Sequence, residues 1–145
     1  MRAVLQRVTS ASVAVRGELV GSIGRGVCAL VGVARSDDQL AADRMAAKIW
    51  QLRIFADDTG AMNRSAADLG LAVLVVSQFT LYGDTAKGRR PSFAAAAAPE
   101  QAAGLLERVV DRLRAAGAPV ATGQFGATMQ LALVNDGPVT VLVET

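Results

Sequence analysis

Runs of apolar residues alternate with helical patterns along the chain, and together they predict a domain in which strands and helices interleave. Two unbroken runs, residues 27–33 and 73–76, are typical of strands buried on both faces. Apolar residues recur at helical spacing from 40 to 52 and from 102 to 113, which predicts two helices that each turn one face to a core. Shorter apolar stretches predict further strands at residues 1–15, 19–23, 53–56, 120–122, 127–134 and 139–145.

Local signals predict where both helices begin and end. Ser36, followed by acids and then Gln39, predicts a capping box that starts the first helix. Pro99 before Glu100 is typical of the first turn of the second helix, and Gly117 predicts its end.

The interleaving of elements, without internal repeats or a linker, predicts a single α/β domain over residues 1–145. We expect a layered α/β/β arrangement, with a mixed sheet covered by two helices and with additional antiparallel strands. The last strand is apolar on both faces, with Val141 on one and Leu142 on the other. Such a strand near a terminus predicts a contact between subunits.

Composition limits the classes of protein that fit. The chain has 145 residues, 52% of them hydrophobic and only 4% aromatic, which indicates a compact aliphatic core. Its net charge is +2, so any affinity for nucleic acid must come from local clusters of cations. No apolar run approaches the ~18 residues of a membrane helix, and Arg2, Gln6 and Arg7 interrupt the start where a signal peptide would be apolar. We therefore expect a soluble, cytoplasmic protein.

The absence of histidine removes several kinds of chemistry at once. With no imidazole there is no Ser-His-Asp arrangement and no histidine zinc site. The one cysteine, Cys28, lies inside an apolar run and is interpreted as a core residue. The glycines of residues 21–26 lack the Lys-Ser/Thr ending of a phosphate-binding loop. We expect no cofactor and no metal.

The stretch from Val73 to Phe93 is the strongest candidate for a site. If the strand continues past Val76, a period of two puts Gln78, Thr80 and Tyr82 on one face and the residues between them on the other. Three cations follow within the next ten residues. One interpretation is a polar edge and a basic loop that bind an anionic substrate. The other, slightly favoured by these residues alone, is a strand end that satisfies turn backbone beside a solvated loop.

Gly137-Pro138 is the second unusual feature. Its ordinary interpretation, favoured by the sequence alone, is a tight turn between two strands. A cis peptide bond there would instead present carbonyl oxygens in a fixed direction, and such oxygens could test the shape of a ligand.

Three separated segments together resemble the D-aminoacyl-tRNA deacylases. They are Ser77 to Leu81 (SQFTL), Lys87 to Phe93 (KGRRPSF) and Asn135 to Thr140 (NDGPVT). The opening Met1 to Val8 and the segment from Gly123 to Gln130 are also similar to that family, so the resemblance covers essentially the whole chain.

The resemblance implies a cytoplasmic homodimer that hydrolyses the ester between a D-amino acid, or glycine mischarged on tRNA(Ala), and the terminal adenosine of tRNA. It implies that Gly137 and Pro138 form a cis pair that reaches into the site of the partner subunit and rejects L-amino acids through backbone oxygens. It further implies a role for Arg7 in supporting that pair. The residues that the resemblance places around the substrate are Ser77, Gln78, Phe79, Thr80 and Met129.

The residues fit this chemistry on physical grounds as well. An aminoacyl ester is already reactive, so positioning and a backbone N–H aimed at the developing oxyanion can supply much of the acceleration. Thr80 and Ser77 are the candidate catalytic side chains, although neither has a base beside it and the substrate 2′-hydroxyl can activate water instead. The candidate contacts to tRNA phosphates are Lys87, Arg89 and Arg90.

Two rival functions stay open on the sequence. A non-catalytic RNA-binding module would use the basic loop with Phe79 or Phe93 for stacking. A small-molecule ester hydrolase would use the same loop to contact an anionic metabolite.

Overall fold

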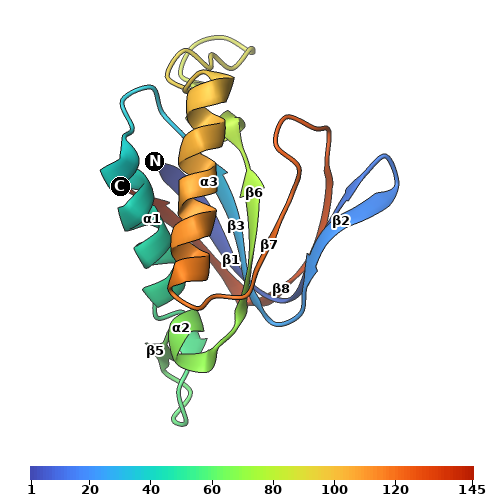
Figure 1. The fold of residues 1–145 in the computed structure, drawn as a ribbon, viewed down its shortest axis with the longest axis vertical. Coiled ribbons are helices and arrows are strands. Elements are labelled where there is room, and N and C mark those ends of the chain that lie inside the picture. Colours follow the sequence, from blue (N-terminus) through green and yellow to red (C-terminus); the bar gives the residue numbers. More distant parts are fainter.

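A six-stranded mixed sheet with two long helices against one face forms the framework of the protein (Figure 1). The computed structural model describes all of residues 1–145. In chain order the elements are β1 (Arg2–Val15), β2 (Glu18–Ile23), β3 (Gly26–Gly32), α1 (Gln39–Gln51), β4 (Phe55–Ala56), β5 (Met62–Arg64), α2 (Ala66–Leu69), β6 (Ala72–Ser77), the 3-10 turn η1 (Phe79–Tyr82), α3 (Pro99–Ala115), β7 (Val120–Thr122) and β8 (Gln130–Glu144). The predicted α/β fold is confirmed.

The strand order is β2-β1-β3-β6-β7, and β8 pairs with β1. β3 pairs with β6 in parallel, with Val27 opposite Val73 and Val31 opposite Ser77. β7 is also parallel to β6, whereas β1 is antiparallel to β2, β3 and β8. The two predicted runs of Val, Leu and Ala are therefore the adjacent central strands of the sheet.

Both faces of the sheet are buried, which gives the predicted α/β/β layering its physical basis. On one face α1 and α3 cover a core that includes Trp50 and Leu113. On the other face β1 and β8 enclose a smaller core that includes Val13 and Cys28. The face of α1 that was predicted to be buried is buried: Ala42, Met45, Ala46, Ile49 and Trp50.

An ion cluster joins the two covering helices. Asp43 on α1 accepts hydrogen bonds from the guanidinium groups of Arg108 and Arg112 on α3, at 2.7–2.9 Å. These two guanidinium groups hold the pKa of the Asp43 carboxyl well below its usual range. The cluster fixes α3 against α1, and the two helices lie side by side in Figure 1. The start of α3 borders the site described below.

The start of α1 was predicted wrongly, and one short helix was not predicted. The N-cap of α1 is Asp38, which accepts from Ala41 N at 2.8 Å, and not Ser36. Asp37 is engaged elsewhere, because it accepts from Ala34 N and from the amine of Met1. The short helix α2 was not predicted; its four residues carry too little apolar pattern, although Ser65 and Asp68 form a capping box.

The expected strands at 127–134 and 139–145 are one strand, β8, which begins only at Gln130. The predicted tight turn at Gly137-Pro138 was also wrong, because β8 continues past it. The peptide bond between these two residues is cis. No helix of the structure is both long and apolar enough to cross a membrane.

Candidate active site

The chain leaves the sheet sharply after β6, and this turn creates the polar edge of the site. The predicted continuation of the strand through Tyr82 was wrong: β6 ends at Ser77, and Phe79 to Tyr82 form the 3-10 turn η1. Gln78 N still donates to Val31 O of β3 at 2.8 Å. The chain then turns, and Leu81 N donates to Gln78 O at 3.3 Å. The alternation of faces predicted for residues 77–82 therefore does not apply.

A cavity of about 760 Å³ opens beside this turn. Its walls come from four segments of the chain: the end of β3 with the residues after it, the end of β6 with η1, the stretch that leads into α3, and the loop between β7 and β8. The lining is mostly apolar and comprises Val31, Val33, Arg35, Ser77, Phe79, Phe93, Ala96, Ala97, Ala98, Pro99, Gln101, Ala102, Phe125, Gly126, Ala127 and Met129.

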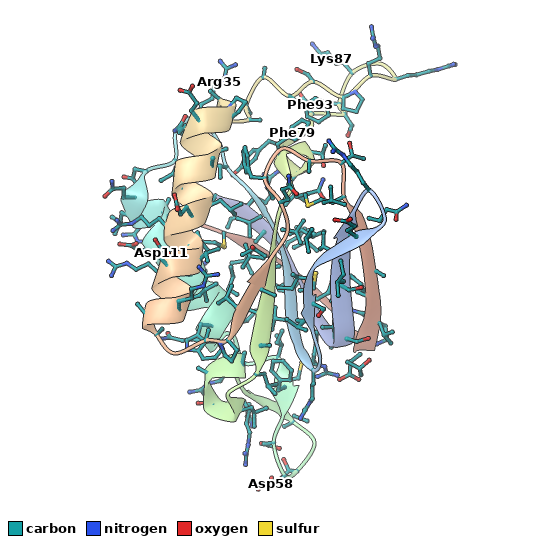
Figure 2. All side chains as sticks on the ribbon, turned by 45° about the vertical axis from the view of Figure 1, so that its right-hand side comes forward. Arg35, Asp58, Phe79, Lys87, Phe93 and Asp111 are labelled. Atoms are coloured by element: carbon teal, nitrogen blue, oxygen red, sulfur yellow. The ribbon has the colours of Figure 1, made fainter.

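Half of the aromatic side chains in the protein line this cavity. The chain has six aromatic residues, and Phe79, Phe93 and Phe125 are three of them. Their exposed fractions are 54%, 37% and 40%, values that are large for phenylalanine. The rings of Phe79 and Phe93 meet edge to face with centroids 5.1 Å apart, and both lie at the end of the sheet opposite Asp58 (Figure 2). Exposed aromatic rings around one apolar cavity form a binding surface for a flat ring.

The candidate catalytic side chains carry no activating base. The hydroxyl of Thr80 accepts a hydrogen bond from the side-chain amide of Gln78. An amide donor stabilises the oxygen and does not remove its proton, so Thr80 is not prepared as a nucleophile. Ser77 lines the cavity, and its hydroxyl has no hydrogen bond within the protein. The predicted meeting of Gln78 with Thr80 is found, although a turn and not a strand brings it about.

The remaining titratable groups do not supply a base either. Burial raises the pKa of the Cys28 thiol to about 11, in agreement with its interpretation as a core residue. Burial, together with the negative charge of Asp37, raises the pKa of Tyr82 to about 12. Nowhere do three or more acidic, cysteine or histidine side chains come together in a metal-holding group. The chemistry of the cavity therefore depends on hydroxyls, an amide and main-chain groups.

The turn η1 offers such main-chain groups. The first N–H groups of a helical turn have no acceptor within it, and no side chain caps this one. These are the N–H groups of Phe79 and Thr80, beside the cavity. Arg2 holds the other end of the turn: its Nη1 donates to Leu81 O at 2.8 Å, and its guanidinium lies 5.0 Å from the ring of Tyr82.

The predicted basic loop projects away from the body of the protein above Phe79 and Phe93 (Figure 2). Asp84 and Ser92 close the loop through two backbone hydrogen bonds of 2.8 and 2.9 Å. All three cations of the loop are exposed, and none forms an ion pair within the protein: Lys87, Arg89 and Arg90. The structure thus brings three unpaired cations close to the mouth of the cavity.

Gly137 and Pro138 lie in a bulge of β8. The pairing of β8 with β1 passes from Val8 opposite Asn135 to Gln6 opposite Thr140, so Arg7 alone stands opposite residues 136–139. Gly137 and Pro138 are exposed, and Gly137 has a φ of +128°. This φ strains any other L-residue, and a Cβ at Gly137 would also lie 2.7 Å from Arg7 Nη2 and 2.9 Å from Val139 Cγ2, which together favour glycine.

Two side chains support this bulge. Arg7 donates from Nε to Asp136 O at 3.1 Å and from Nη1 to Ile54 O at 2.7 Å. Asn135 spans the bulge: its Oδ1 accepts from Val139 N at 3.1 Å, and its Nδ2 donates to Val139 O and Arg7 O at 2.9 and 3.3 Å. Asn135 thereby replaces the strand partner that Val139 lacks.

Comparison with known proteins identifies the family. The model of the D-Tyr-tRNA(Tyr) deacylase family matches residues 4–144. This chain belongs to that family. Among its relatives, D-aminoacyl-tRNA deacylases of Symbiobacterium thermophilum and Chloroflexus aurantiacus are 57% and 58% identical over the whole chain, covering 96% and 91% of those proteins.

Two solved structures have the same fold over essentially the whole chain. The structure of c-Myc DNA Unwinding Element Binding Protein is 42% identical with a TM-score of 0.94, and the match covers 100% of this chain and 99% of that one. A probable eukaryotic D-amino acid tRNA deacylase shares the fold, with a TM-score of 0.83 at 22% identity and coverage of 99% and 98%.

In this deacylase the structure brings together some predicted site residues and separates others. Ser77, Phe79 and Met129 line the cavity, and Gln78 and Thr80 stand beside it, Gln78 just before η1 and Thr80 within it. Gly137 and Pro138 are not part of the cavity of their own chain.

Sequence reasoning missed four lining or supporting residues: Arg2, Arg35, Gln101 and Phe125. Phe125 could have been found as an aromatic residue within the glycine-containing stretch 123–126, in a chain that has few aromatic residues. Arg35 and Gln101 give no such signal, because only the folded chain places them together at the start of α3.

Proposed function

We propose that this deacylase cleaves the ester that joins a D-amino acid, or glycine, to the terminal adenosine of tRNA, with the adenosine in the 760 Å³ cavity. One observation carries the proposal. The cavity is apolar and lined by phenylalanine rings, and polar side chains stand at its edge: Ser77, Gln78 and Thr80. A nucleoside matches both parts, because its base stacks on aromatic rings and its sugar and ester require polar partners.

The proposed chemistry is hydrolysis by positioning. The carbonyl oxygen of the ester gains negative charge during attack by water, and the N–H groups of Phe79 and Thr80 are the donors available to stabilise it. The 2′-hydroxyl of the terminal ribose assists the attacking water, since no side chain at the cavity is a base near neutral pH. The Thr80 and Ser77 hydroxyls orient the ester and form no covalent intermediate.

Selection of the D-form is proposed to need a second copy of the chain. Arg7 pairs with Val27, whereas Ser77 pairs with Val31, so the Gly137-Pro138 bulge and the polar edge are about four strand residues, or roughly 13 Å, apart along β3. Neither Gly137 nor Pro138 lines the cavity of its own chain. In the proposed homodimer the bulge of each chain reaches the site of the other, where its carbonyl oxygens exclude an L-side chain.

An exposed apolar face on β8 supports the proposed dimer. Val134 and Leu142 have exposed fractions of 56% and 68%, and they lie on either side of the Gly137-Pro138 bulge in sequence. An apolar face of this kind on one strand is typical of a contact between subunits. Glycine has no side chain to exclude, so glycine mischarged on tRNA(Ala) is a proposed substrate as well.

The basic loop is proposed to contact phosphates of the acceptor end of the tRNA through Lys87, Arg89 and Arg90. Because aminoacyl-tRNA is used in the cytoplasm, this is the proposed location of the protein.

A deacylation assay with matched D- and L-tyrosyl-tRNA tests the proposal, with D-tyrosine methyl ester as the free ester. Fast release from D-tyrosyl-tRNA alone is expected. Binding without turnover would support an RNA-binding module instead, and equal action on the free ester would support a small-molecule hydrolase.

A pair of variants ties the activity to the cavity. Phe79→Ala should lower kcat/KM by about tenfold, the value of one stacked base. The matched control is Met62→Ala, a residue with the same exposure, 55% against 54%, on β5 away from the cavity. If Phe79→Ala and Met62→Ala have the same kcat/KM, the cavity is not the site that binds the substrate.

A further inference from the structure

A second cavity, of about 320 Å³, adjoins the first one. It lies between α3 and the ends of β6 and β7, which are neighbours in Figure 1. Ser77 and Phe125 line both cavities, so they form the partition between them. The two cavities follow α3 in order: residues 98–102 line the first, and residues between 103 and 114 line the second.

Two oppositely charged side chains of α3 line the second cavity, Glu107 and Arg114. Both are exposed, and neither forms an ion pair. Their neighbours Arg108 and Arg112 are instead held by Asp43. Seven residues of helix separate Glu107 from Arg114 by roughly 10 Å, with both on one face. The cavity thus offers a carboxylate nearer to the first cavity and a guanidinium farther from it.

We propose that this second cavity binds the cytidine that precedes the terminal adenosine of tRNA, with Glu107 as the residue that recognises the base. This inference rests on the proposed function, which puts the adenosine in the first cavity. The nucleotide before the adenosine must then pass the partition formed by Ser77 and Phe125. The ring of Phe125 is 40% exposed and is available to stack between the two bases.

The chemistry of the lining selects cytidine. A carboxylate accepts a hydrogen bond from the N4 amino group of cytosine, and it repels the O4 acceptor of uracil. Arg114, at the far end, is placed for the phosphate on the 5′ side of the cytidine. Every tRNA ends in cytidine and adenosine, so this contact serves all aminoacyl-tRNAs alike and separates them from free aminoacyl adenosine.

The test compares three esters of D-tyrosine: the adenosine ester, the ester of the dinucleotide CpA and the ester of UpA. For the wild-type protein, kcat/KM should be about tenfold higher for the CpA ester than for the adenosine ester, which is the effect of one stacked and hydrogen-bonded base. The kcat/KM for the UpA ester should be well below that for the CpA ester. Glu107→Ala should bring the ratio of CpA to UpA close to one. The matched control is Glu100→Ala, an exposed acid on the same helix that lines neither cavity and should keep the ratio.

The outcomes separate the two proposals. If the wild-type protein cleaves the adenosine ester but treats all three esters equally, the cytidine site is overturned and the proposed function stands. If it cleaves neither these esters nor D-tyrosyl-tRNA, the proposed function itself fails. The inhibition constants of the uncharged dinucleotides CpA and UpA give a second measurement. For the wild-type protein the constant of CpA should be about tenfold lower than that of UpA, and for Glu107→Ala the two constants should be equal.

Discussion

The substitution Asn135→Asp tests whether the hydrogen bonds of Asn135 hold the Gly137-Pro138 bulge in the shape that selects D- over L-aminoacyl-tRNA. The aspartate keeps the oxygen that accepts from Val139 N, but it replaces the Nδ2 donor with a second acceptor. That acceptor would face the carbonyl oxygens of Val139 and Arg7, which now lie 2.9 and 3.3 Å from Nδ2. The substitution therefore changes two attractive contacts into repulsive ones without altering the size of the side chain.

The expected magnitude follows from these contacts. Each lost hydrogen bond costs about 1 kcal/mol net, and the unsatisfied, partly buried carbonyls add to that, so the bulge should lose about 2–3 kcal/mol. If selection depends on the shape of the bulge, a loss of this size corresponds to a fall of roughly 30- to 150-fold in the ratio of D- to L-tyrosyl-tRNA hydrolysis. The melting temperature should fall by roughly 5–10 °C for a chain of this length.

The assay measures kcat/KM for D- and L-tyrosyl-tRNA at a temperature where circular dichroism shows the variant to be folded. A structural effect alone would lower both rates together, whereas loss of selection raises the rate for the L-form. The matched control is Asn63→Asp, which removes a donor to Asp57 in the exposed turn after β4. A folded Asn135→Asp protein that rejects L-tyrosyl-tRNA as well as wild type does would refute the proposed role of this residue.

Three further predictions concern catalysis, tRNA binding and stability. Thr80→Ala should lower kcat less than tenfold, because no base activates its hydroxyl, and a complete loss of activity in a folded protein would contradict the substrate-assisted route. Changing Lys87, Arg89 and Arg90 together to Ala should weaken binding of every tRNA and reduce the slope of log K against log salt by about 2–3, and an unchanged slope would exclude them as phosphate contacts. Asp43→Asn should lower the melting temperature at pH 7. Since the folded pKa of Asp43 lies below its unfolded value of about 3.9, the stabilisation is present above that pH and is lost as the pH falls. Melting curves of the two proteins should therefore converge in acid.

Much of the fold could be predicted because its signals are local. Pro99 begins α3, and the apolar runs at 27–33 and 73–76 became the paired central strands β3 and β6. The errors arose where tertiary contacts override a local signal. Ser36 has the sequence of a cap, but Asp37 is committed to the backbone of Ala34 and so the helix begins two residues later, from Asp38.

The site was only partly predictable for a related reason. Ser77 to Thr80 are adjacent in sequence, so any turn brings them together, and their pattern was informative even though the predicted strand was wrong. Phe125 reaches the same cavity from a different part of the chain. No spacing rule relates it to Phe79, because their proximity depends on how β6 and β7 pair and on the loop that follows β7.

The separation of the cavity from the bulge bears on how such a site can distinguish mirror images. The cavity side presents flexible or symmetrical groups, a hydroxyl, an amide and phenylalanine rings, and a side chain of either hand can be placed against them at similar cost. Discrimination requires a rigid group at a third position that only one enantiomer can avoid. The main-chain carbonyls of the Gly137-Pro138 bulge meet that requirement better than any side chain, because no rotamer change moves them away and because Arg7 and Asn135 hold the flanking residues Asp136 and Val139. In the proposed homodimer the bulge of one chain meets the cavity of the other, so selection of the D-form should be lost when the two chains separate. A single chain should still bind the adenosine, because every residue that lines the cavity belongs to that chain.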